Sequence, residues 1–224
     1  MIRQEEISFV IDSQRDAFLK QESGFTREAL SSIPVADSFA TLITGIRRCG
    51  KSTLLLQLLR KKYQDAIYLN FDDIRLSGFS TDDMTRLYRE IERRKIRVLF
   101  FDEIQIIAGW EKLISQLLRE SFKVFITGSN ASMLSVELGT HLTGRHLPME
   151  LFPFSYSEFI KFKNLDNSEK SVLDYLKTGG LPDYLKTGMP QILNSLVDDI
   201  LIRDIAVRRS IRDVSSLRQL AAFL

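Results

Sequence analysis

The sequence predicts an α/β fold built on a parallel sheet. Between residues 39 and 160, short apolar segments rich in β-branched and aromatic residues alternate with longer segments of helical periodicity. The apolar segments are almost uninterrupted by polar residues, which is typical of parallel strands that are covered on both faces. Strands that alternate with helices form parallel sheets through right-handed crossovers. We therefore expect a sheet with helices packed on both of its faces.

The individual elements follow from the same patterns. Strands are expected at 38–45, 66–71, 96–101, 122–127 and 145–152. Helices are expected at 12–21, 51–63, 80–95, 109–121, 131–138 and 155–162. Capping residues support three of these helices: Asp12 or Ser13 for the first, Ser80 or Thr81 for the third, and Ser155 with Glu158 as a capping box for the last.

On this pattern the chain divides into three parts. An N-terminal segment covers residues 1–38, the alternating core covers 39–160, and the strand signal then fades into a helical region over 161–224. The final stretch, LRQLAAFL, is an apolar helical stripe with no capping residue after it. This stripe fits either a natural end that packs on the core or a chain that continues in a longer parent protein.

Composition excludes several classes of protein. A single cysteine among 224 residues rules out an internal disulfide and a zinc site made of cysteines, and two histidines argue against a His/Cys metal site. The apolar runs are too short to span a membrane, and the N-terminus is too acidic for a signal peptide. We therefore expect a cytoplasmic protein without a membrane partner.

The segment GIRRCGKS at 45–52 matches the pattern G-x-x-x-x-G-K-[ST] in full, between an expected strand and an expected helix. In such a loop the glycines let backbone N–H groups face phosphate oxygens, and the helix N-terminus adds a positive field. We predict that Lys51 binds the outer phosphates and that Ser52 places its hydroxyl on Mg²⁺. The predicted nucleotide-binding residues are Gly45, Ile46, Arg47, Arg48, Cys49, Gly50, Lys51, Ser52 and Thr53, with Ser129 from a later strand.

The variable positions of this loop leave alternatives open. Arg47 and Arg48 can contact phosphate or a partner, and a pair of surface arginines fits at least as well. Cys49 fits a small tolerated residue better than a nucleophile, since no histidine or acidic base lies near it in sequence.

A second motif, VLFFDEIQ, places Asp102 and Glu103 at the end of a buried strand. An aspartate at this place in a P-loop protein holds Mg²⁺, and we predict this role for Asp102. Glu103 can orient and deprotonate the attacking water, which makes it the predicted catalytic base. The alternative is an acidic pair that only caps the strand, and the complete phosphate loop weakens that interpretation.

Polar residues after the next strand, in VFITGSN, are expected near the same site, because ligands bind at the carboxyl ends of parallel strands. Asn130 or Ser129 can sense the γ-phosphate and position water, or cap the following helix, and both roles can hold. Arg145 can stabilise charge on the γ-phosphate, in cis or from a neighbouring subunit, or it is a solvated loop arginine.

These motifs together resemble the AAA-type ATP-binding family known as AAA domain family 14, whose members commonly carry an uncharacterised C-terminal domain. The matching stretches are TGIRRCGKSTLLLQL, YLNFDDIRL, FFDEIQIIAGWEKLISQL, FITGSNASMLSVELGTHLTGR, LFPFSYSEF, GGLPDYL and DDILIRDI. The resemblance implies an additional-strand P-loop ATPase core with strand order 5-1-4-3-2. It implies phosphate and Mg²⁺ at Lys51 and Ser52, metal and water at Asp102 and Glu103, and a finger at Arg145. Such proteins usually run well past this chain's end, which favours a longer parent protein.

Several functions fit these motifs. The first is an ATPase that uses ATP and Mg²⁺ to drive a conformational change, with Arg145 acting within its own chain or between subunits of a homo-oligomer. The second is a nucleotide-gated module with little turnover that regulates an unknown protein or nucleic-acid partner through the basic stretch at 202–212. The alternative for this stretch is a solvated helix face, which fits it better. A P-loop kinase lacks an acceptor-substrate motif, and a GTPase is disfavoured because no N-K-x-D sequence occurs. Because hydrolysis needs a base beside the metal, Glu103 favours the ATPase, with weak turnover expected in an isolated subunit.

Overall fold

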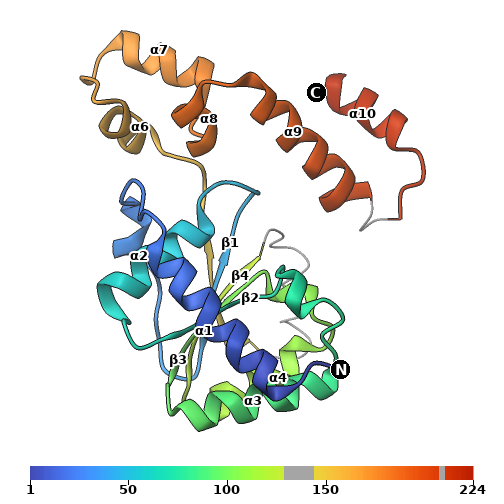
Figure 1. Ribbon diagram of the computed structural model, residues 1–224. Coiled ribbons are helices and arrows are strands. Elements are labelled where there is room, and N and C mark those ends of the chain that lie inside the picture. The colour runs from blue at the N-terminus through green and yellow to red at the C-terminus, as the bar shows by residue number, and fades with distance from the viewer. Residues whose placement is uncertain (129–143, 207–209, 224) are drawn as a thin grey trace. The chain divides into compact units, whose positions relative to one another are not determined.

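The computed structural model describes residues 1–128, 144–206 and 210–223, which form two compact units. Unit 1 consists of Met1–Gly45 and Lys51–Leu151, and unit 2 consists of Ile46–Gly50 and Phe152–Leu224. Figure 1 traces the helices and strands of both units. The domain limits predicted from the sequence, at residues 38 and 160, stay predictions.

Unit 1 is built on a sheet whose strands, among the described residues, are five and all parallel (Figure 1). The strands are β1 Ala40–Thr44, β2 Ile67–Asn70, β3 Val98–Asp102, β4 Lys123–Gly128 and β5 His146–Glu150. Their order is β2-β3-β4-β1-β5, which read from the other edge is 5-1-4-3-2. The predicted α/β fold, parallel sheet and strand order are therefore confirmed.

Apart from the start of the first, the helices that cover this sheet begin and end close to their predicted positions. They are α1 Gln4–Lys20, α2 Lys51–Lys62, α3 Thr81–Arg94 and α4 Trp110–Arg119, with short 3₁₀ turns η1 Glu28–Ser31, η2 Ile74–Leu76 and η3 Ile104–Ile106. Ser80 is the N-cap of α3, one of the two candidates for that cap. The helix expected at 131–138 lies outside the described residues.

The first helix was predicted too short. α1 begins at Gln4 rather than near Asp12, because the Glu6 side chain accepts the Arg3 backbone N–H across 3.0 Å. Arginine is not among the favoured N-cap residues, so the sequence pattern did not signal this start. The added turns bury Ile7, Val10 and Ile11 in the core.

The core of unit 1 packs one face of the sheet against α1, α3 and α4. Its members from the sheet include Leu42, Leu69, Phe101 and Ile126, which alternate with residues on the other face. On that other face the rings of Phe100 and Phe125 stack with centroids 4.7 Å apart. Both faces of the sheet are thus apolar, as the uninterrupted strand sequences predicted.

Helix α1 also covers the free edge of the sheet, along β2. The Gln14 side chain accepts a hydrogen bond from the backbone N–H of Asn70 and donates one to the carbonyl of the same residue, at 2.6 and 3.0 Å. An edge strand otherwise exposes such groups to unwanted pairing. Gln14 therefore continues the hydrogen-bond pattern of the sheet at the carboxyl end of β2.

Unit 2 is helical in its described part after residue 152. Its elements are α6 Tyr156–Lys163, α7 Glu169–Thr178, α8 Pro182–Thr187, α9 Pro190–Asp199, the π-helical segment η4 Ile200–Ala206 and α10 Val214–Phe223. The predicted capping box starts α6, where Ser155 Oγ accepts the Glu158 N–H across 3.1 Å. At Gly180, a Cβ would lie 2.0 Å from the carbonyl oxygen of Phe154, so only glycine fits there.

No helix within the described ranges combines the length and the apolar character that crossing a membrane would need.

Candidate functional site

The carboxyl ends of β1 and β3 carry the two predicted motifs at the same edge of the sheet. β1 ends at Thr44, and Gly45 follows with φ of 145°, in the region that favours glycine. α2 begins at Lys51, whose Nζ donates to the carbonyl oxygen of Gly45 across 2.9 Å. The lysine is 6% exposed, so its ammonium group is held close to the strand end that starts the loop.

Ser52 and Asp102 are hydrogen-bonded at this edge. The Ser52 hydroxyl donates to Asp102 Oδ2 across 2.7 Å, and Asp102 is 1% exposed. Mg²⁺ prefers oxygen ligands and commonly takes one or two carboxylates from the protein and the rest from substrate phosphates and water. The two oxygens therefore fit a Mg²⁺ ion that arrives with a nucleotide, and the Lys51 ammonium fits its phosphates.

Two further hydroxyls hold the Asp102 carboxylate, and neither was predicted from the sequence. Tyr68 on β2 donates to Oδ2 across 3.0 Å, and Thr127 on β4 donates to Oδ1. Burial, together with the charge of Asp102, raises the pKa of the Tyr68 phenol, so this group stays a donor. The sequence has a hydroxyl on each strand that flanks β3, Tyr68 on β2 and Thr127 on β4, but their contact with Asp102 depends on the strand order.

Glu103 directly follows β3 and has a left-handed backbone, with φ of 53°. Its N–H donates to Thr127 Oγ1 across 3.3 Å, and its carboxylate accepts a hydrogen bond from the Gln105 amide. A non-glycine residue in this region costs about 1 kcal/mol, and such strain concentrates at functional sites. Glu103 is thereby brought to the same edge as Lys51, Ser52 and Asp102.

The variable loop residues belong to unit 2 and bind carboxylates there. Arg47 donates to both carboxylate oxygens of Asp204, at 2.9 and 3.1 Å. Arg48 lies 3.9 Å from a carboxylate oxygen of Asp199. Cys49 is fully buried, which agrees with a packing residue rather than a nucleophile. The phosphate contacts predicted for the two arginines stay predictions, and these ion pairs were not foreseen.

The remaining predicted residues divide into two cases. Ser129 and Asn130 lie outside the described residues. Arg145 is exposed and precedes β5, and its carbonyl accepts the N–H of Ala40 at the start of β1. With a rise of about 3.3 Å per residue, the five steps from Ala40 to Gly45 span about 16 Å, more than an arginine side chain can bridge. The fold therefore does not bring Arg145 to Lys51 and Ser52 of its own chain.

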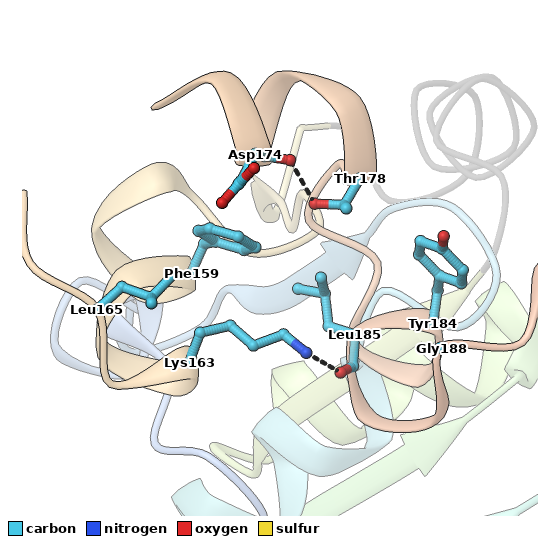
Figure 2. Close-up of a pocket in the computed structure, with 8 residues that line it drawn as sticks. All are labelled: Phe159, Lys163, Leu165, Asp174, Thr178, Tyr184, Leu185 and Gly188. Carbon is cyan, nitrogen blue, oxygen red and sulfur yellow. Dashed lines mark hydrogen bonds between the residues drawn. The ribbon is translucent and has the colours of Figure 1, made fainter. Parts of the chain in front are cut away.

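Unit 2 contains a hollow of about 250 Å³ that none of the predicted site residues lines. Figure 2 shows its lining. The residues are Phe159, Lys163, Leu165, Asp174, Thr178, Tyr184, Leu185 and Gly188. Lys163 Nζ donates to the Leu185 carbonyl across 2.6 Å, so its ammonium is engaged within the unit. The accessible lining of the hollow is mainly apolar.

The sheet order, the loop after β1 and the acidic residues at the carboxyl end of β3 together define a P-loop nucleotide-binding protein. A family model described as AAA domain matches residues 37–160, more than half of the chain. The chain belongs to this AAA domain family, which confirms the resemblance found in its motifs and makes it a nucleotide-binding protein of the AAA type.

Its curated relatives are themselves uncharacterized proteins. One from Methanocaldococcus jannaschii is 35% identical over 82% of this chain and 45% of its own length. Another, from Haemophilus influenzae, is 35% identical over 83% of this chain and 51% of its own length. The chain thus spans about half the length of these relatives. Among solved structures, PCH-2 of C. elegans aligns with 78% of this chain and 47% of its own at 16% identity, with a TM-score of 0.40. A likeness at this level carries no argument about function.

Proposed function

We propose that this chain binds ATP with Mg²⁺ and hydrolyses it, and that hydrolysis drives a conformational change. The observation that carries the proposal is the Ser52–Asp102 hydrogen bond of 2.7 Å, with Glu103 next in the chain. A metal-binding oxygen pair with an adjacent carboxylate is what hydrolysis at a phosphate requires. Membership of the AAA domain family supports nucleotide binding in general.

Binding falls to the loop from Gly45 to Thr53. Lys51 neutralises the outer phosphates as a buried ammonium, and the loop backbone donates N–H groups to phosphate oxygens. Ser52 and Asp102 hold the metal, and Mg²⁺ when bound stabilises the negative charge that develops on the transferred phosphoryl group. The predicted phosphate roles of Arg47, Arg48 and Ser129 belong to this part of the proposal.

Hydrolysis falls to Glu103. Its carboxylate orients the attacking water and takes one proton from it, while Thr127 fixes the Glu103 backbone through the N–H group. The role predicted for Asn130, which lies outside the described residues, is to position the same water. Arg145 stabilises the γ-phosphate charge of a neighbouring subunit, because its own phosphate loop is out of reach.

The experiment compares nucleotide binding and turnover by the wild-type chain, by Lys51→Ala and by Lys112→Ala. Lys112 is exposed on α4, so Lys112→Ala is a matched control that removes one lysine away from the loop. We expect wild type and Lys112→Ala both to bind ATP. Both should release phosphate with Mg²⁺ but not with EDTA. Lys51→Ala should lose binding by at least tenfold, roughly the value of one charged hydrogen bond. Wild-type chain that binds no ATP in Mg²⁺ would overturn the proposal.

A further inference from the structure

Tyr68 is a buried tyrosine whose hydroxyl and ring make different contacts. Its hydroxyl donates to Asp102 Oδ2 across 3.0 Å, and the residue is 5% exposed. Its ring stacks on that of Phe18, with centroids 3.7 Å apart and an interplanar angle of 4°. Because the ring is clamped, the hydroxyl has a fixed position relative to the carboxylate.

The Asp102 carboxylate is held by hydroxyls on both of its oxygens. Ser52 and Tyr68 donate to Oδ2, and Thr127 donates to Oδ1. Ser52 is itself an expected metal ligand, so its hydroxyl would contact both Asp102 and the ion. Tyr68 is not an expected metal ligand, so it can keep its hydrogen bond to Oδ2 when Ser52 binds an ion.

We infer that Tyr68 is a positioning residue for the metal-binding carboxylate, and that the N-terminal helix α1 supports it. This inference deepens the proposed function and rests on it. Tyr68 acts through Asp102 and does not contact nucleotide or metal itself. Groups that hydrogen-bond metal ligands orient them, and losing one such partner typically costs about 10–100-fold in metal affinity or activity.

Helix α1 supplies the other side of the arrangement. Phe18 near its end stacks on Tyr68, and Gln14 one turn earlier binds the backbone of Asn70 on the same strand. Both residues precede the segment matched by the AAA domain model, which begins at residue 37. A segment outside the family core thus supports the strand that orients Asp102.

The test replaces Tyr68 by phenylalanine, which keeps the ring and removes only the hydroxyl. The matched control is Tyr88→Phe, because the Tyr88 hydroxyl also donates to a carboxylate, that of Glu120 across 2.7 Å. Glu120 follows α4 and precedes β4, so it lies where the parallel strands begin, whereas Asp102 lies where they end. Binding of a fluorescent ATP analogue and ATP turnover are titrated with Mg²⁺ for wild type and for both variants.

We expect Tyr68→Phe to need about tenfold more Mg²⁺ for half-maximal binding and turnover. Its analogue binding in EDTA and its unfolding midpoint without Mg²⁺ should stay close to those of Tyr88→Phe. Excess Mg²⁺ should restore its turnover, which it would not do for a merely structural defect. Phe18→Leu should shift the same titration in the same direction by a smaller factor.

The outcomes separate the two proposals. A Tyr68→Phe titration that coincides with wild type would overturn the positioning role and leave the proposed function standing. A shift in Mg²⁺-dependent binding without turnover by any variant would support the positioning role and contradict hydrolysis. Wild type without Mg²⁺-dependent nucleotide binding would overturn both.

Discussion

The hydroxyl of Ser52 donates to a carboxylate oxygen of Asp102 across 2.7 Å, although 50 positions separate the two residues in sequence. The contact exists because α2 starts and β3 ends at the same edge of a parallel sheet, where successive strands of this fold present their ligands. It joins the phosphate-binding motif to the acidic motif. The site can therefore be tested one oxygen at a time.

Removing either oxygen should weaken the metal site. We expect Ser52→Ala and Asp102→Asn each to raise the Mg²⁺ concentration for half-maximal ATP binding, and Asp102→Asn by more than the roughly 10–100-fold of an outer partner. Isothermal titration of the nucleotide with and without Mg²⁺ measures the effect. Unchanged Mg²⁺ dependence in Asp102→Asn would remove Asp102 from the metal site.

The left-handed backbone of Glu103 predicts which of two substitutions at this position leaves the protein more stable. At a left-handed position, glycine should be more stable than alanine by about 1 kcal/mol, the reverse of the order in a helix interior. We expect Glu103→Gly to have a higher free energy of unfolding than Glu103→Ala, while both lose ATP turnover. Denaturant unfolding and phosphate release measure the two effects.

Lys95 provides the control for that comparison. It is exposed, has φ of 56° and ends α3 away from the site. Lys95→Gly should likewise be more stable than Lys95→Ala, with turnover at the wild-type level in both. If glycine and alanine were equally stable at position 103 but not at 95, the backbone of Glu103 would not be strained.

The ion pairs that Glu90 makes within α3 should make stability depend on pH. Hydrogen bonds from Arg93 and Arg94 lower the pKa of the buried Glu90 carboxyl to about 2. A lowered carboxyl pKa stabilises the fold above the unfolded pKa, near 4.5, and this contribution is lost as pH falls toward 2. We expect Glu90→Gln to be about 1–3 kcal/mol less stable at pH 7. The deficit, measured by denaturant unfolding, should shrink below pH 4.5, and a constant deficit would contradict the assignment.

Arg145 should act only between subunits. We expect Arg145→Ala alone to be slow, and Lys51→Ala alone to be inactive. Mixing the two should recover turnover, because the Lys51→Ala subunit donates an arginine to the intact site of its neighbour. An arginine finger is worth about 10³–10⁵ in rate, so the recovery should be large. Wild-type turnover by Arg145→Ala at saturating protein concentration would assign this arginine to the surface.

The fold could be predicted from the sequence because its signals are local. Strands such as 98–102 are nearly continuous apolar runs. The loop at 45–52 has the spacing of glycines, lysine and serine that is typical of a phosphate-binding loop. The start of α1 was missed because Arg3 is an unusual N-cap. The π-helical segment over Ile200–Ala206 also has no simple sequence signature.

Only the site residues that lie in a recognisable sequence motif were predicted from the sequence. Lys51, Ser52, Asp102 and Glu103 lie in motifs, whereas Tyr68 reaches Asp102 across 34 positions and through the strand order. Gln14 reaches Asn70 across 56 positions, from a helix that no motif includes. Such partners depend on which strands are neighbours and on which face each side chain lies, and both follow from the tertiary fold rather than from local sequence.

The most direct test of the central claim compares the wild-type chain with Glu103→Gln, with Glu92→Gln as an exposed control on α3. ATP binding and phosphate release in Mg²⁺ are measured for each across a range of protein concentrations. We predict that all three bind ATP alike and that Glu103→Gln alone loses turnover, by about 10²–10⁴-fold as expected for a lost general base. If all three bind ATP and none turns it over at any concentration, the chain is a nucleotide-gated module and the hydrolysis account is wrong.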